Sequence, residues 1–256
     1  MYAPTLNQGL VFHTLANDLN VGYHIRQGSI WEPYIYKICE LVLDEESVFL
    51  DAGSAYGYHA LRAAALCQEV LSFEPQRVLY ESQLLSLRDN GISNVRVIRS
   101  AVGDMDESVS MGRIDYSQIG NVGNLSVGVG GASVPCTRID SLDLSRVDLI
   151  KCDVQGYEER VIIGALSTLA RCRPVLVVEF ESVHLERFGS SSKRLACLLR
   201  DAGYELLLID APYPSDVLCV PSERVDALVS KLVVGDAVDN EVNSPLEAGI
   251  VRSVLL

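Results

Sequence analysis

The sequence is poor in several features that would assign it to familiar classes. No apolar run in its 256 residues approaches the ~20 residues that cross a bilayer, and no basic patch precedes an apolar core at the N-terminus. We therefore expect neither a membrane span nor a signal peptide. Positive charge is also scarce, since 21 Lys and Arg face 34 Asp and Glu, giving a net charge of −13. Because nucleic-acid binding depends on clustered positive charge, we expect no nucleic-acid partner.

Paired cysteines are missing as well. The seven cysteines form no C-x-x-C motif, and several, such as Cys39, Cys67 and Cys152, lie inside apolar segments. An odd number of cysteines in such places is typical of reduced thiols packed in a core. Disulfides persist mainly in oxidising compartments, so the pattern favours a cytoplasmic protein.

What the sequence does contain is an alternation of strand-like and helix-like segments. Strands are predicted at 47–53, 69–75, 94–102, 146–154 and 174–181, with helices at 58–67, 76–91, 157–171 and 191–203. The last two strands, 204–210 and 215–221, are joined by a short proline-rich link and should form an antiparallel hairpin at one edge. The pattern predicts an α/β fold: a seven-stranded, mostly parallel sheet with a reversed last strand and helices on both faces.

The chain has no internal repeat and no clear linker, so we interpret it as one domain over 1–256. Within it we expect an N-terminal helical cap (1–45), a catalytic core (46–220) and a C-terminal extension (221–256). Residues 104–138 interrupt the alternation and are rich in Gly, Ser and Asn. They form either a plain variable insertion or a small hairpin, a flap over the carboxyl edge of the sheet.

A glycine turn follows the first predicted strand. Asp51, Gly53 and Gly57 form the pattern D-x-G-x-x-x-G, in which Ala55 occupies the place of the second glycine of a dinucleotide fingerprint. The turn contains no Lys or Arg, and Asp51 would repel a polyphosphate. The turn therefore favours a cationic, phosphate-free ligand, a description that S-adenosylmethionine meets.

The ends of the next strands fit the same ligand. Glu74 ends the second strand, where an acidic residue can accept hydrogen bonds from both ribose hydroxyls. Alone, it could equally be a solvated or capping carboxylate. Ser100 and Ala101, which we place at the end of the third strand, are small enough to flank an adenine ring.

At this point the chain resembles the FkbM family of S-adenosylmethionine-dependent methyltransferases. The resemblance rests on an ordered set of segments between residues 28 and 181: GSIWEP, FLDAGSAYGYHA, SFEPQ, DNGISNVRVIRSAVGD, VPCTRIDSL and VDLIKCDVQGYEERVIIGA. It implies a Rossmann-like class I methyltransferase fold with S-adenosylmethionine as cofactor. The cofactor-site residues that it implies, with their neighbours in the same turns, are Asp51, Gly53, Ser54, Ala55, Tyr56, Gly57, Glu74, Pro75, Ser100, Ala101 and Asp153.

One position departs from the family pattern. The family usually shows an acidic residue in D-V-E-G-x-E, whereas this chain has Gln155 within Asp153-Val154-Gln155-Gly156-Tyr157-Glu158. If that position acts as a base or metal ligand, this protein must do without it. If it only positions the cofactor or backbone, the change is mild, and this is the interpretation we favour.

Candidate catalytic residues are carboxylates at the ends of the fourth and fifth strands: Asp153, Glu179 and Glu181. Asp153 could act in catalysis or orient the cofactor's amino group. We predict no metal site, because Glu179 and Glu181 alternate on a strand and should face opposite sides unless the strand has already ended. Weaker candidates for contact with the acceptor, which could equally be packing residues, are Trp31, Tyr58, His59 and Gln155.

The resulting hypothesis is an O-methyltransferase that acts on a hydroxyl group of a small-molecule, sugar or lipid-linked acceptor. The alternative is a module that binds S-adenosylmethionine but has a degenerate acceptor site.

Overall fold

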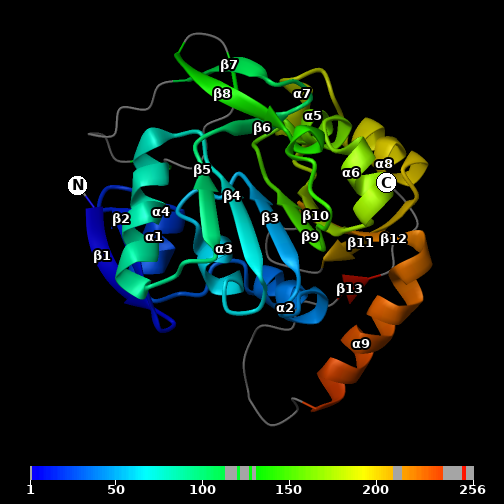
Figure 1. Cartoon of the computed structure of the whole chain (residues 1–256), viewed down its shortest axis with the longest axis horizontal. Coiled ribbons are helices and arrows are strands. Elements are labelled where there is room, and N and C mark those ends of the chain that lie inside the picture. Colours follow the sequence, from blue (N-terminus) through cyan, green and yellow to red (C-terminus); the bar gives the residue numbers. More distant parts are fainter. Residues whose placement is uncertain are drawn as a thin grey trace.

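One large sheet runs through the centre of the structure (Figure 1). The computed structural model describes residues 2–112, 120–121, 127–128, 131–209, 215–238 and 250–251. In spatial order the strands of the sheet are β13 (Ile250–Val251), β11 (Tyr204–Ile209), β12 (Asp216–Pro221), β10 (Val175–Glu179), β9 (Leu149–Cys152), β3 (Val48–Ala52), β4 (Glu69–Phe73) and β5 (Val95–Ile98). Pairing is parallel from β10 to β5, whereas β12 is antiparallel to both β10 and β11. The seven-stranded, mostly parallel sheet with a reversed last strand is confirmed, and β13 adds a short eighth strand.

Helices cover both faces of this sheet (Figure 1). They are α1 (Val21–Arg26), α2 (Pro33–Val42), α3 (Tyr58–Ala63), α4 (Arg77–Asn90), α5 (Glu158–Ile163), α6 (Leu166–Cys172), α7 (Ser182–Glu186), α8 (Ser192–Asp201) and α9 (Val225–Val238), with 3-10 turns η1 (Ile139–Leu142) and η2 (Ser222–Arg224). Phe49 of β3 belongs to the cluster that contains the apolar side chains of α2 and α3, whereas Leu50 belongs to the cluster with those of α5, α6 and α8. Since successive strand residues point to opposite faces, both faces of β3 need a helical cover.

The helix predicted over 157–171 is divided into α5 and α6 at Gly164. A Cβ atom at Gly164 would lie 2.0 Å from the backbone oxygen of Gly103. Gly103 ends the short strand β6 (Ala101–Gly103). Glycine at this position therefore lets β6 pack directly against the break between the two helices.

The N-terminal segment is not purely helical, so the prediction of a helical cap was incomplete. It begins with an antiparallel hairpin of β1 (Tyr2–Asn7) and β2 (Leu10–Leu15), followed by α1 and α2. The two turn residues, Gln8 and Gly9, have φ angles of 46° and 84°, the left-handed geometry of a two-residue hairpin. Asn90 at the end of α4 holds the hairpin, because its amide accepts from the N–H of Val11 and donates to the Val11 carbonyl.

The third predicted strand, 94–102, is in fact two strands in different sheets. β5 ends at Ile98, and Ala101 begins β6, which pairs with β8 (Ala132–Arg138); β8 in turn pairs with β7 (Glu107–Met111). The order β6-β8-β7 makes a separate three-stranded sheet. Ser100 therefore lies in the link between the sheets, not at a strand end. The antiparallel β7–β8 pair is the hairpin anticipated within 104–138, although much of the segment between them lies outside the described residues.

Among the described residues, no helix is long and apolar enough to cross a membrane.

Candidate active site

A cavity of about 330 Å³ opens where β3, β4, β9 and β10 end. Its volume falls in the range of ~300–1,000 Å³ that is usual for small-molecule sites. The first residues of α2 and parts of the β6–β8 sheet complete the wall, with Trp31 on one side and Met111 on another. Met111, in β7, brings a described part of the 104–138 segment to the wall, and a flap role for this segment stays a prediction.

Gly53 shows why the turn after β3 requires glycine. Its φ angle is +84°, and a Cβ atom there would lie 1.8 Å from the backbone oxygen of Asp153. Gly53 is therefore required because its backbone lies against the chain segment that follows β9, and not only to let a ligand approach it. Gly53, Ser54 and Ala55 all line the cavity.

The other three members of the turn lie behind the cavity wall. Asp51 is fully buried, and neither of its carboxylate oxygens has a hydrogen-bond partner among the described residues. Burial raises the pKa of Asp51, and the ammonium group of Lys151 on β9 opposes this rise. The hydroxyl of Tyr56 accepts from the N–H of Leu15 at 3.4 Å, and Gly57 (φ +71°) packs against Gln83. Asp51, Tyr56 and Gly57 therefore do not line the cavity, contrary to the prediction.

Glu74 faces the cavity at the end of β4, as predicted, and Pro75 lies beside it. Its carboxylate accepts from the N–H groups of Ala55 (3.0 Å) and Gln76 (2.7 Å), one on each oxygen. Burial raises the pKa of Glu74 to about 8, and the two N–H donors only partly offset that rise. Each oxygen still has a lone pair for a hydroxyl group of a ligand.

Ser100 and Ala101 also line the cavity. The Ser100 hydroxyl bonds to the carbonyl oxygen of Pro135 (3.0 Å) and to the hydroxyl of Thr137 (2.8 Å). Both partners belong to β8. The link after β5 therefore holds the three-stranded sheet against the cavity.

Asp153 lies on the wall just after β9 and is held by two side chains. Lys151 lies 3.4 Å from one carboxylate oxygen, and the Gln155 amide donates to the other at 2.9 Å. Burial acts to raise the pKa of Asp153, but the Lys151 charge and the Gln155 hydrogen bond outweigh it and hold the pKa below its usual value. Gln155 thus acts as a donor to Asp153, which a glutamate at this position could not do.

Glu179 at the end of β10 lies on the other side of Gln155, 3.5 Å from the amide nitrogen. Burial, and then the charge of Asp153, raise the pKa of Glu179 to about 10. Glu179 therefore carries a proton at neutral pH while Asp153 is ionised. The strand ends here, and Glu181 comes just before α7 and also lines the cavity. The expectation that Glu179 and Glu181 face opposite sides of a strand was therefore wrong.

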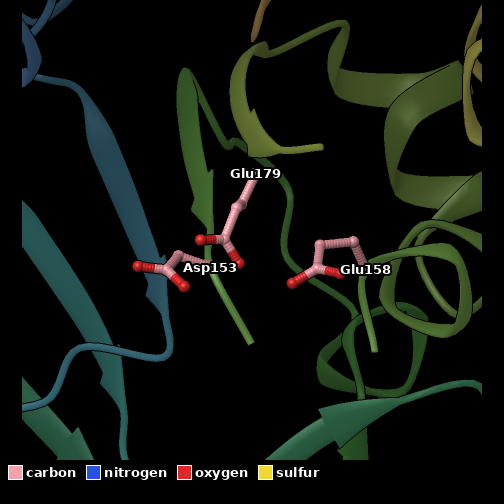
Figure 2. Close-up of side chains that lie close together, drawn as sticks. All are labelled: Asp153, Glu158 and Glu179. Carbon is pink, nitrogen blue, oxygen red and sulfur yellow. The ribbon is translucent and has the colours of Figure 1, made fainter. Parts of the chain in front are cut away.

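A third carboxyl group, Glu158, was not anticipated. Oxygen atoms of Asp153, Glu158 and Glu179 lie within 4.8 Å of one another. Figure 2 shows the three side chains close together. One oxygen of Glu158 accepts from the N–H groups of Val154 and Gly156, which fixes the turn before α5. Burial raises the pKa of Glu158 to about 7. The only hint in the sequence was an acidic residue in the first helical turn after the Gln-Gly pair, a common capping pattern. That this cluster holds no metal stays a prediction.

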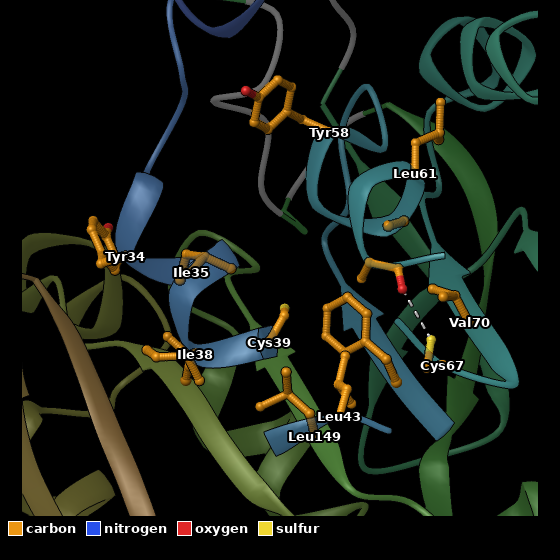
Figure 3. Close-up of a cluster of buried hydrophobic side chains, with 14 of the residues drawn as sticks. Tyr34, Ile35, Ile38, Cys39, Leu43, Tyr58, Leu61, Cys67, Val70 and Leu149 are labelled. Carbon is orange, nitrogen blue, oxygen red and sulfur yellow. Dashed lines mark hydrogen bonds between the residues drawn. The ribbon is translucent and has the colours of Figure 1, made fainter. Parts of the chain in front are cut away.

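The N-terminal segment supplies another part of the wall. Glu32, immediately before α2, lies 2.9 Å from Nε2 of His59, and the Tyr34 hydroxyl donates to Asp216 at 2.7 Å. Figure 3 shows Tyr34 and Tyr58 among the buried side chains of α2 and α3. All four weaker candidates, Trp31, Tyr58, His59 and Gln155, line the cavity. Glu32 and Asp216 were missed because nothing in the local sequence brings them together.

The described wall is strongly acidic. Lys151 is its one lysine or arginine, whereas six acidic residues line it: Glu32, Glu74, Asp153, Glu179, Glu181 and Asp216. Such a wall favours a ligand with positive charge and many hydrogen-bond donors, and it opposes phosphate.

Comparisons with known proteins identify the family of the chain. The family model described as "Methyltransferase FkbM domain" matches residues 51–206, more than half of the chain. The crystal structure of methyltransferase FkbM from Methylobacillus flagellatus KT is similar at 16% identity and a TM-score of 0.49, over 68% of this chain and 43% of that one. A putative methyltransferase from Streptococcus mutans in complex with SAH is similar at 13% identity and a TM-score of 0.46, over 74% and 97% of the two chains. This chain thus spans less than half of the M. flagellatus chain, and no curated protein matches it.

Proposed function

Because the chain belongs to the FkbM family of methyltransferases, with S-adenosylmethionine as methyl donor, we propose that it is an O-methyltransferase. The proposed acceptor is a hydroxyl group on a small molecule, a sugar or a lipid-linked compound. The observation that carries the proposal is that Glu74 and Asp153, at the ends of different strands, both line one acidic cavity. The acceptor class rests on the family resemblance and on the chemistry of this wall.

The residues present fit S-adenosylmethionine. The cofactor carries a sulfonium and an ammonium group, and the cavity wall carries an excess of carboxyl groups. Glu74 has lone pairs left for the two ribose hydroxyls, and the ionised Asp153 would accept from the ammonium group. Ser100 and Ala101 would lie against the adenine ring. When bound, the cofactor supplies an electrophilic methyl group on sulfur.

The remaining wall suits a hydroxyl acceptor. Carboxyl groups are strong acceptors for hydroxyl protons, and Glu181 and Asp216 lie on the same wall as Glu179. Trp31 and Tyr58 add apolar faces that exclude water from the reacting groups. The chain therefore contributes positioning and a water-poor, polar enclosure, the two main requirements of methyl transfer.

Calorimetry with S-adenosylhomocysteine tests the cofactor half of the proposal. We expect Glu74→Gln to weaken binding ~10- to 100-fold, because one of the two carboxyl oxygens available to the ribose hydroxyls becomes an amide donor, and a hydroxyl left without its acceptor costs ~1–3 kcal/mol. The matched control is Glu81→Gln on α4, an exposed acidic residue whose described partner is Arg77. Equal binding by wild type and Glu74→Gln would contradict the assignment.

Transfer of labelled methyl groups tests the acceptor half. The protein is incubated with S-adenosylmethionine carrying a labelled methyl group and with fractionated neutral metabolites, glycans and lipid-linked sugars. We expect a labelled methyl ether. Cofactor binding with no labelled product in any fraction would instead support the alternative, a binding module with a degenerate acceptor site.

A further inference from the structure

Two cavity residues form a pair that neither the sequence pattern nor the family match points to. Nε2 of His59, in the first turn of α3, lies 2.9 Å from a carboxylate oxygen of Glu32. The side chains are only 7% and 15% exposed, yet both residues line the cavity. A histidine with a carboxylate on one ring nitrogen has a fixed ring orientation and a fixed tautomer.

The backbone of Glu32 indicates that this pairing is held in place by the surrounding fold. Its φ angle is +43°, in the left-handed region that non-glycine residues seldom occupy. Glu32 directly precedes Pro33, and its carbonyl accepts from the N–H of Ile35 as α2 begins. Unusual backbone of this kind persists where the surroundings enforce it, often at functional sites.

The other ring nitrogen of His59 remains available to the cavity. Within the described part of the chain, Nδ1 has no hydrogen-bond partner. It is also absent from the described polar atoms that are both fully buried and unpaired, so it is accessible from the cavity. Asp51 and Asp153 also lie near enough to interact electrostatically with the imidazole. The Glu32 carboxylate, hydrogen-bonded to Nε2, would stabilise the imidazolium that forms when Nδ1 takes a proton.

The neighbouring carboxyl groups are less suited to take a proton. Both oxygens of Asp153 already have donors, Lys151 and Gln155, and its low pKa makes it a weak base. Glu179 already carries a proton at neutral pH. His184 also lines the cavity, but its Nδ1 lies 3.6 Å from Glu179, beyond hydrogen-bond distance, and has no hydrogen-bond partner among the described residues. His59 is the wall histidine whose ring is hydrogen-bonded to a carboxylate, which orients it.

We propose that His59, oriented by Glu32, is the general base that takes the proton of the acceptor hydroxyl. The proton passes from the acceptor oxygen to Nδ1, and the electron pair of the O–H bond stays on the oxygen, which bonds the methyl carbon. The bond between that carbon and the sulfonium sulfur breaks, and its electron pair stays on sulfur, so that neutral S-adenosylhomocysteine leaves. His59 is then a catalytic residue and Glu32 a positioning residue. This inference rests on the proposed O-methyl transfer.

Nuclear magnetic resonance tests the tautomer without any acceptor. The full chain is labelled with ¹⁵N at its four histidines, and His59 is identified by comparison with His59→Gln in two-bond ¹H–¹⁵N spectra. With S-adenosylhomocysteine bound, we expect the neutral ring of His59 to carry its proton on Nε2 and none on Nδ1. A proton on Nδ1 of the neutral ring would overturn the proposal.

Kinetics of methyl transfer to the acceptor found by the labelling assay provides the second readout. We expect His59→Gln to lower turnover about 100-fold or more with little change in S-adenosylhomocysteine affinity, since general bases contribute ~10²–10⁴-fold. The matched control is His13→Gln, because His13 is also buried and lies 2.7 Å from Asp89, but does not line the cavity. Unchanged turnover in His59→Gln would refute the role. Failure of wild type to bind S-adenosylhomocysteine would refute the proposed function, a distinguishable outcome.

Discussion

The substitution Gly53→Ala tests the geometry that joins the two halves of the site. A single added methyl group would lie 1.8 Å from the Asp153 carbonyl oxygen and 2.8 Å from its carbon, and the residue would have to keep φ near +84°. Neither atom can move without moving the loop after β9. The substitution therefore affects the β3 turn and the Asp153 segment together.

Two costs can be separated by a control. The left-handed conformation costs an alanine ~1–2 kcal/mol, and forcing a methyl group into a packed site costs typically ~1–3 kcal/mol. Gly28 has a φ angle of +74° with no atom within 4 Å of an added Cβ, so Gly28→Ala carries the first cost alone. We expect Gly53→Ala to lower the free energy of unfolding by ~2–5 kcal/mol and Gly28→Ala by ~1–2 kcal/mol.

Urea unfolding of both variants measures these free energies. Calorimetry measures S-adenosylhomocysteine binding in buffer without urea, at a temperature where both variants are folded. We expect the displaced Asp153 to weaken binding in Gly53→Ala and not in Gly28→Ala. Equal stability and equal affinity of the two variants would refute the view that backbone contact between β3 and β9 segments shapes the site.

Two further predictions concern stability. Burial raises the pKa of Glu158 from 4.5 to about 7, so the stability that its protonated form contributes is complete below pH ~4.5 and is lost as pH rises through about 7. Glu158→Gln keeps an acceptor for the loop N–H groups but does not titrate. The drop in unfolding free energy from pH 5 to pH 8 should therefore be smaller in this variant than in wild type, by an amount on the order of 3 kcal/mol. An equal drop in both proteins would contradict the burial argument. Asn90→Ala removes both hydrogen bonds to Val11 and should lower the unfolding free energy by ~1–3 kcal/mol in urea titrations, whereas an unchanged midpoint would show that the hairpin needs no such anchor.

The sequence was a good guide wherever a pattern is local. Strand and helix periods along 47–91 and 174–221 gave the core elements, and the short link before β12 gave its reversal. The N-terminal hairpin was missed because its turn, Gln8-Gly9, lacks the Asn-Gly signal of a two-residue loop. The third strand was read too long because Arg99 and Ser100 do not interrupt an apolar alternation, although the chain changes sheets there.

By itself, the sequence determined the α/β fold class with its mostly parallel sheet, the glycine turn and the acidic residue at the end of the second strand. Each of these depends on residues that lie a few positions apart. Only the tertiary structure decided which of those residues reach the cavity. Asp51 and Gly57 lie behind the wall, Glu158 joins Asp153 and Glu179, and Glu32 reaches His59 across a gap in sequence. Such contacts join segments that are distant along the chain. They depend on packing and on the desolvation of buried charge, and a local sequence pattern contains information about neither.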